Sequence, residues 1–318
     1  MQNNIARDEY ERLVNMAGRL AIAAASLLII VKLIAWMTTG SSSILAALTD
    51  SLMDVTTSII NLLAIRVALQ PADKEHRFGH GKAESLAGLT QAAFISGSAV
   101  FLLFNSISAL IHEKTIVASQ LGIIVMLFSV LVTVLLVLFQ TYIVKKTGSM
   151  AIKADSLHYR TDIALNSAVL LALILSGLGW YWADGVFAIL VSFYILHGAW
   201  EIGKQSVDAL MDKQLPKSEE QQIVKVACEL DGVIGVHDLR TRQSGNTKFI
   251  QLHLELADEL NLMEAHRKVE LLEDELEKLF SDVDIIIHPD PISVVPKEKI
   301  HYKVDTETHT IFVAKENE

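Results

Sequence analysis

Long runs without a charged side chain constrain this chain more than any other feature. Three such runs are Leu86–Ile111, Thr115–Val144 and Ile163–Ala183. Each reaches or exceeds the roughly 20 helical residues that cross a hydrocarbon core of about 30 Å. Of the 318 residues, 51% are hydrophobic, which is more than a chain living wholly in water usually carries. We therefore expect the chain to lie in a lipid bilayer.

The apolar pattern predicts six membrane helices in the first two thirds of the chain. They are expected near residues 13–39, 43–69, 83–112, 116–145, 149–178 and 181–207. The connections near 66–82 and 145–153 are rich in Lys and Arg, whereas those near 40, 115 and 180 contain only Lys114 as a basic residue. Because basic connections stay in the cytoplasm, both termini are expected there.

After Asp212 the pattern changes to that of a soluble domain. Helices are expected over about 218–230 and 262–280, and strands over 233–243, 248–256 and 283–288. The order αββαβ predicts a small α+β sheet with helices on one face. The chain thus divides into an all-α membrane domain of six transmembrane helices (1–209), a cytoplasmic α+β domain (210–292) and a polar C-terminal tail (293–318), in which residues 310–313 are a candidate strand.

The negative charge is confined to the C-terminal third. Residues 1–210 carry 14 basic and 14 acidic side chains, whereas residues 211–318 carry 13 basic and 23 acidic ones. An acidic region without a basic stripe argues against a nucleic-acid partner and is compatible with cations. Cys228 is the only cysteine, which excludes a disulfide framework and a thiolate cluster. Any metal site must therefore use nitrogen and oxygen ligands.

Two pairs of polar residues interrupt the predicted membrane helices at the same spacing. Asp50 and Asp54 lie in the second helix, and His158 and Asp162 lie in the fifth. Residues four apart share one helix face, so each helix offers two ligands. The two helices enter the membrane from opposite sides, and about 1.5 Å per residue places both pairs roughly 10 to 15 Å deep. The pairs are therefore expected to meet near the midplane.

Three carboxylates inside a bilayer need a compensating positive charge. A dication or protons would supply it; alternatively, the residues line a wet groove or pair with Lys153 and Arg160. One imidazole and three carboxylates match the tetrahedral site that Zn²⁺ favours and are too few for Ca²⁺. We therefore expect a transition-metal site, with zinc preferred and cadmium, ferrous iron and manganese left open.

Two further groups of residues have metal-ligand chemistry. Asp73, His76 and His80 lie in the connection 70–82, which suits one metal ion or a simply solvated loop. In the strand 248–256 the apolar residues alternate, so His253 is expected on the opposite face, either unligated or in a metal site. The residues expected to converge there are His237, His253, His288 and Asp290, with His266 joining from the same or a neighbouring subunit.

These motifs resemble the cation diffusion facilitator family, and especially its bacterial zinc and ferrous-iron efflux pumps. The stretches that carry the resemblance are residues 43–54, 71–84, 154–162 and 237–243. The resemblance covers about residues 15–295. The tail after Pro296, with His301 and His309, lies outside it.

The resemblance implies a homodimeric metal/proton antiporter in the bacterial inner membrane, whose cytoplasmic domain is similar to a ferredoxin-like copper metallochaperone. Its transport-site residues match Asp50, Asp54, His158 and Asp162, with His158 exchanging protons, and its loop site matches Asp73, His76 and His80. Ligands of a structural or regulatory zinc site at the dimer interface match His237, His253, His266, His288 and Asp290. Lys82 and Asp212 match a salt bridge between subunits.

Three classes of function remain: a secondary transporter, an intramembrane metallohydrolase and a membrane-bound metal sensor. The hydrolase is disfavoured because the sequence contains no His-Glu-x-x-His motif. A sensor would leave the midplane ligands unexplained. The sequence therefore favours a transporter, not an enzyme, that exports zinc in exchange for protons by alternating access.

Overall fold

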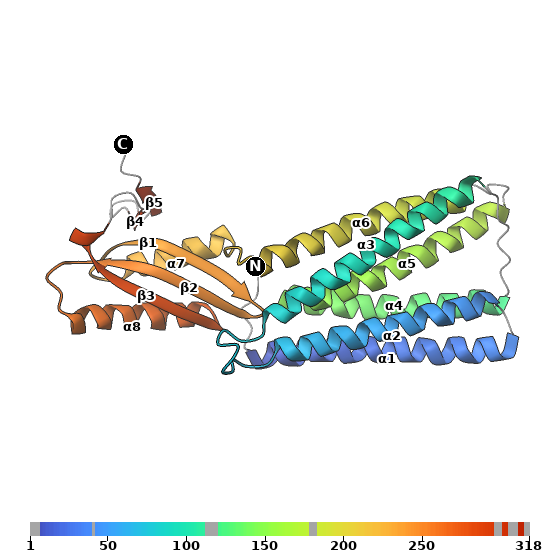
Figure 1. Cartoon of the computed structure of the whole chain (residues 1–318), viewed down its shortest axis with the longest axis horizontal. Coiled ribbons are helices and arrows are strands. Elements are labelled where there is room, and N and C mark those ends of the chain that lie inside the picture. Colours follow the sequence, from blue (N-terminus) through green and yellow to red (C-terminus); the bar gives the residue numbers. More distant parts are fainter. Residues whose placement is uncertain are drawn as a thin grey trace. The chain divides into compact units, whose positions relative to one another are not determined.

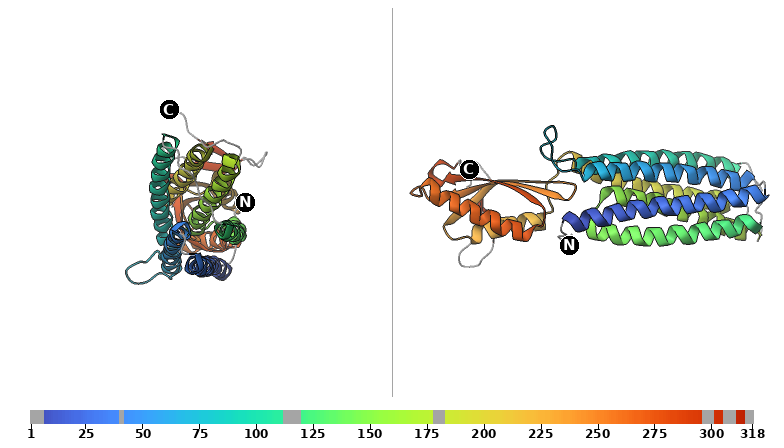
Figure 2. Two further views of the ribbon diagram at one scale, coloured as in Figure 1. Left: turned by 90° about the vertical axis from the view of Figure 1, so that its right-hand side faces the viewer. Right: turned by 90° about the horizontal axis from the view of Figure 1, so that it is seen from below.

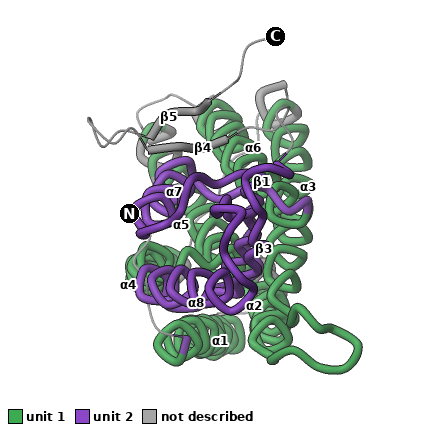
Figure 3. Tube along the Cα trace, turned by 90° about the vertical axis from the view of Figure 1, so that its left-hand side faces the viewer, with its two compact units in different colours: residues 1–3, 8–210 green, residues 4–7, 211–318 purple. Residues whose placement is uncertain are grey.

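The computed structural model describes residues 7–39, 42–111, 120–177, 183–295, 301–304 and 311–314. The chain divides into two compact units, one built on residues 8–210 and the other on residues 211–318 (Figure 3). The described part of the first unit is helical, and the described strands all belong to the second unit.

Six long helices dominate the described part of the first unit and run alongside one another (Figures 1 and 2). They are α1 (Arg7–Thr39), α2 (Ser42–Ala68), α3 (Lys82–Ile111), α4 (Gln120–Thr147), α5 (Met150–Gly177) and α6 (Ala183–Leu210). The predicted helical membrane domain is confirmed. α1 begins six residues before the expected start, because its first turns, Arg7–Arg12, are mostly charged and carry no apolar signal.

Large apolar side chains cover the outer surface of these helices. Met37 is 74% exposed and Phe104 is 68% exposed. A continuous apolar exterior suits lipid and is unfavourable in water. Among the residues whose side chains are described, α1, α2, α3, α4 and α6 are each long and apolar enough to cross a membrane.

The fifth helix occupies a central place in the bundle. α5 packs against α2, α3, α4 and α6. It contributes to two apolar clusters, one shared with α3 and α6 and one shared with α1 and α4. Its first half also carries Lys153, Asp155, Arg160 and Asp162. Charged groups of membrane helices are stable where protein surrounds them, so the position of α5 allows it to carry these residues.

A glycine allows α5 and α6 to approach closely. A Cβ atom on Gly198 of α6 would lie 2.8 Å from Cδ1 of Leu157, which is closer than carbon atoms normally pack. Small residues at such crossings are typical of packed membrane helices. Because Leu157 directly precedes His158, this contact fixes the helix segment that carries the predicted ligands.

We predict that Gly198→Val lowers the melting temperature of the purified protein in detergent, because over-packing costs about 1–3 kcal/mol. Gly97→Val on α3 is the matched control, since a Cβ atom there meets nothing within 4 Å. Thermal unfolding of the two variants should separate them by several degrees. Equal melting temperatures would show that the α5–α6 contact does not constrain the bundle.

The second unit is an α+β domain. Its elements are α7 (Lys217–Glu229), β1 (Val233–Ser244), β2 (Thr247–Leu256), α8 (Leu262–Leu279), β3 (Val283–Pro291), the short 3₁₀ helix η1 (Ile292–Val294), β4 (His301–Val304) and β5 (Ile311–Ala314). The strand order is β3-β2-β1-β4-β5, in which β2 and β3 are parallel and the other neighbours antiparallel. The predicted order αββαβ is confirmed. β4 and β5 extend the sheet with residues that we expected to be a polar tail with one short strand.

One face of this sheet is covered by both helices. Ile223 of α7 and Leu272 of α8 share an apolar core with the alternating residues Ile250, Leu252 and Leu254 of β2. Successive side chains of a strand point to opposite faces, so residues 251, 253 and 255 of β2 face away from this core. The alternation thereby sets the face on which histidines of the sheet can meet.

Candidate metal centre

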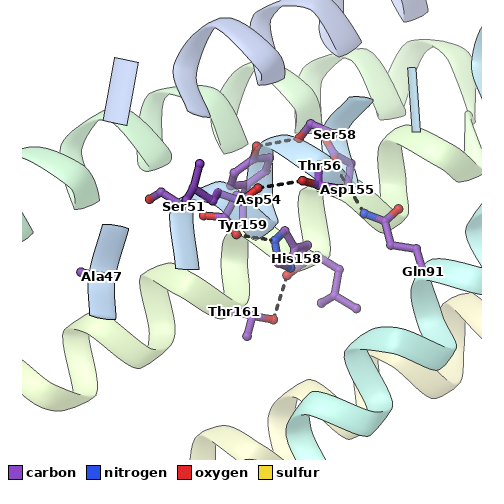
Figure 4. Close-up of polar contacts among 12 residues, drawn as sticks. Ala47, Ser51, Asp54, Thr56, Ser58, Gln91, Asp155, His158, Tyr159 and Thr161 are labelled. Carbon is purple, nitrogen blue, oxygen red and sulfur yellow. Dashed lines mark hydrogen bonds and ion pairs between the residues drawn. The ribbon is translucent and has the colours of Figure 1, made fainter. Parts of the chain in front are cut away.

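Asp54 of α2 meets His158 and Asp162 of α5 inside the helical bundle. Each of the three offers a ligand atom, and these atoms all lie within 4.8 Å of one another. Asp54 Oδ1 is 3.0 Å from His158 Nε2 (Figure 4). The side chains of His158 and Asp54 are only 15% and 9% exposed. One imidazole nitrogen and two carboxylates, held this close, are a donor set that Zn²⁺ accepts.

The fourth predicted ligand, Asp50, lies in α2 one turn before Asp54, but its side chain is outside the described residues. A cation reaches the same segment of α2 from α1. Lys32 Nζ donates to Ser51 Oγ at 2.6 Å and to the Ala47 carbonyl at 3.1 Å. Sequence reasoning overlooked Lys32. The signal was present, since any charged residue inside an apolar span needs a partner.

The alternative partners proposed for the carboxylates bind elsewhere. Lys153 Nζ contacts Glu201 Oε1 at 3.1 Å and Gln205 Oε1 at 2.7 Å, both on α6. Arg160 donates to Thr141 Oγ1 of α4 at 2.8 Å. Both cations therefore have described partners other than Asp54 and His158, and a bound cation or protons can compensate the carboxylates.

Asp155 is a further buried acid close to this cluster. It lies on α5 one turn before His158 and is fully buried. Its carboxylate accepts a hydrogen bond from Gln91 of α3 at 3.5 Å (Figure 4). It accepts another from Gln140 of α4 at 2.6 Å. Two amide side chains thus orient this carboxyl group. The sequence reasoning missed Asp155, although its charge within an apolar helix was a visible signal.

The loop between α2 and α3 brings its three predicted ligands together. Ligand atoms of Asp73, His76 and His80 lie within 4.8 Å of one another. Asp73 Oδ1 accepts backbone hydrogen bonds from His76 at 2.6 Å and Glu75 at 2.9 Å. The hydrogen bond from the His76 amide is the main reason why the pKa of Asp73 lies below its ordinary value. The other hydrogen bonds to Asp73 act in the same direction, and partial burial opposes them. Asp73 and His76 are half exposed, so these side chains can either bind a metal ion or stay hydrated.

The sheet of the second unit brings His237, His253 and Asp290 together within the same 4.8 Å limit. His237 and His253 are opposite one another on β1 and β2, and His253 is opposite His288 on β3. Asp290 Oδ2 lies 2.7 Å from His253 Nδ1 and 3.4 Å from His237 Nε2. Three adjacent strands therefore form a third nitrogen and oxygen ligand set.

Glu255 orients this ligand set from behind. Its Oε1 atom is 3.1 Å from His237 Nδ1, and both side chains are fully buried. A carboxylate on the second nitrogen of a histidine fixes the ring and leaves the other nitrogen for a metal. Glu255 was not predicted, although it lies two residues from His253 and so on the same face of β2. β1 also bulges directly after His237, where Asp238 has a φ of 49°.

The remaining predicted residues lie outside these three clusters. His288 Nδ1 contacts Asp290 Oδ1 at 2.9 Å from an exposed position at the edge of the second-unit cluster. His266 lies on α8, exposed, and its described ion-pair partner is Glu270 at 3.4 Å. Lys82 donates to the Leu210 carbonyl at 3.2 Å, and Asp212 contacts Arg242 at 3.3 Å. Pairing between Lys82 and Asp212 of different subunits stays a prediction.

The chain matches models of a known family over most of its length. "Cation efflux transmembrane domain" matches residues 19–211, and "Cation efflux protein, cytoplasmic domain" matches residues 215–292. These two ranges contain every predicted metal ligand, whereas β4 and β5 lie beyond them. Proteins named cation-efflux pump FieF from Shigella boydii serotype 18, Citrobacter koseri and Escherichia coli K12 are each 50% identical over 289 residues. The alignments cover 91% of this chain and 96% of each relative.

Burial lowers the pKa of His237, although the hydrogen bond and charge of Glu255 raise it. We therefore predict that, without metal, His237 gains its proton below the ordinary histidine pKa of about 6.5. Histidine ring signals followed by NMR against pH in chelated full-length protein will measure this. Glu255→Gln should lower the pKa of His237 further, because it removes the neighbouring charge. A value at or above 6.5 in the unsubstituted protein would contradict the buried, neutral ligand described above.

Proposed function

This chain belongs to the cation diffusion facilitator family of metal efflux transporters, and on that premise we propose that it exports zinc from the bacterial cytoplasm in exchange for protons. The cluster of Asp54, His158 and Asp162 carries the proposal. It lies within membrane-spanning helices, where carboxylates require a cation or protons, and a transporter needs both in alternation.

The donor set supports zinc as the transported ion. Imidazole and carboxylate ligands suit zinc and related first-row metals, whereas thiolates would favour softer ions. Cys228, the only cysteine, lies in α7 and outside the three clusters. Cadmium and ferrous iron are the competing substrates to compare, since geometry as well as ligand type decides among these ions.

Proton coupling follows from the contact between Asp54 and His158. A hydrogen bond at 3.0 Å between a carboxylate and an imidazole nitrogen contains a proton. Zinc bound by the same two atoms must displace that proton, so loading is linked to proton release. Protons that enter from outside would reverse the exchange and release the metal. Acidification is therefore expected to weaken zinc binding.

Alternating access is supported by the packing of α5. This helix shares one apolar cluster with α3 and α6 and another with α1 and α4. A relative movement of these two helix groups would change which end of α5 is open while the ligands stay near the middle. Rocking of helix groups around a central site is the usual mechanism of secondary transporters.

We place both termini and the second unit in the cytoplasm on the basis of the basic connections. There His237, His253 and Asp290 would hold a structural or regulatory zinc ion, oriented by Glu255. A homodimer would explain the predicted role of His266, because its own chain leaves it exposed and outside the ligand cluster. In that dimer Lys82 and Asp212 would pair between subunits.

A metal sensor is the second candidate, and the second-unit cluster alone would suffice for it. Flux separates the two functions, because a sensor needs no movement of metal through the bilayer. An intramembrane hydrolase is less favoured still, since the sequence offers no His-Glu-x-x-His motif.

We predict that Asp54→Asn and Asp162→Asn each reduce zinc uptake into inverted proteoliposomes by at least about 100-fold. Loss of a residue that only orients a metal ligand costs about 10- to 100-fold, so loss of a ligand itself should cost at least as much. Each removes a charged ligand from a cluster with few donors. Asp8→Asn, at an exposed position near the start of α1, is the matched control and should transport normally. Uptake near the unsubstituted rate in either cluster variant would remove this cluster from the transport path.

A further inference from the structure

A second polar feature of the helical bundle is a recess between α4, α5 and α6. It has a volume of about 320 Å³, which is the space of roughly ten water molecules. Its polar lining includes Thr141 and Lys145 of α4, Lys153 and Arg160 of α5, and His197 and Glu201 of α6. None of the ligands in the Asp54, His158 and Asp162 cluster lines it.

The charges of this recess are unbalanced. Three permanent cations face one carboxylate, Glu201, which contacts Lys153 at 3.1 Å. Arg160 donates to a neutral partner, the Thr141 hydroxyl, at 2.8 Å. Lys145 contacts no carboxylate among the residues that the structure describes. Two positive charges thus lack a carboxylate partner within helices that cross the membrane, and such charges are stable only beside an anion or water.

Apolar stripes continue from the recess along both flanking helices. On α4, residues at helical spacing from Lys145 are large, apolar and exposed; they are Leu131, Leu135, Leu138 and Tyr142. On α6 the corresponding exposed residues, at helical spacing from His197, are Leu190, Phe193 and Tyr194. The surface is therefore cationic at one end and apolar along its length. This arrangement is complementary to a phospholipid with an anionic headgroup and apolar acyl chains.

The cationic end lies near the ends of its helices. Lys145 is two residues from the end of α4, and Lys153 is three residues from the start of α5. Arg160 lies about 15 Å along α5, from where a long side chain can extend towards the headgroup level. Basic pockets between membrane helices at this level are suited to acidic lipid headgroups.

We propose that this recess binds the phosphate group of an anionic phospholipid such as phosphatidylglycerol, with its acyl chains along the apolar stripes of α4 and α6. Lys145 and Arg160 supply the charge that Glu201 does not neutralise. A lipid fits better than a free phosphate ion, because its acyl chains would cover the apolar stripes, whereas a phosphate ion would leave them uncovered. The site is independent of the proposed transport function, since it uses none of the same residues.

Native mass spectrometry of the full-length protein in detergent tests this assignment. Increasing amounts of phosphatidylglycerol, phosphatidylcholine or inorganic phosphate are added, and the bound species are counted for each chain. We expect one phosphatidylglycerol to bind more tightly than any phosphatidylcholine, and phosphate alone to leave no adduct. In the double variant Lys145→Gln/Arg160→Gln, the affinity of that lipid should fall roughly 30-fold, since each basic residue near the surface contributes about five- to sixfold.

Arg19→Gln/Lys204→Gln is the matched control, because it removes the same two kinds of charge from exposed positions on α1 and α6 outside the recess. It should retain the lipid. Equal binding of the two lipids by the unsubstituted protein, or equal lipid loss in both double variants, would overturn the proposal. So would phosphate binding that saturates without lipid. The comparison of lipids on the unsubstituted protein decides the question even if a variant folds poorly.

Discussion

A carboxylate inside a membrane bundle is stable only while a proton or a cation accompanies it, and the helical unit is organised around that constraint. Asp54 and Asp162 share His158, whereas Asp155 relies on the amides of Gln140 and Gln91. The bundle thus accommodates its buried acidic side chains in two different ways. The first leaves lone pairs that a metal or protons can occupy, and the second engages both carboxyl oxygens in hydrogen bonds from amide side chains. The exchange that we propose is therefore assigned to the first cluster.

α5 connects the two polar regions of this bundle. Asp155, His158 and Asp162 follow one another at helical spacing, and so do Lys153 and Arg160 together with Leu157 on another face. One face meets α2 at the ligand cluster, while the other lines the recess shared with α4 and α6. The close contact of Leu157 with Gly198 holds the helix between them. A movement of α5 would therefore change both the ligand cluster and the recess. The bound lipid that we propose could influence transport in this way.

Sequence periodicity predicted the features that depend on one element at a time. The spacing of His158 and Asp162, and the alternation that isolates His253 from the apolar face, are local properties of a helix and a strand. Glu255, Lys32 and Asp155 were missed because their roles depend on partners from other elements, such as His237 on the neighbouring strand or Gln140 on the neighbouring helix. β4 was likewise not foreseen, since its pairing with β1 is a long-range contact. Asp50 and the intersubunit role of His266 remain predictions, because they depend on an undescribed side chain and on a second chain.

The central claim is that zinc and protons exchange at the same ligands. The most direct measurement follows zinc and internal pH together in proteoliposomes while potassium and valinomycin clamp the membrane potential. Antiport at shared ligands predicts that a proton gradient directed against the movement of zinc accelerates zinc flux, and that zinc movement without a gradient drives protons the other way. Zinc flux that is unchanged by the pH gradient, with no counter-movement of protons, would contradict antiport and favour a uniporter or channel.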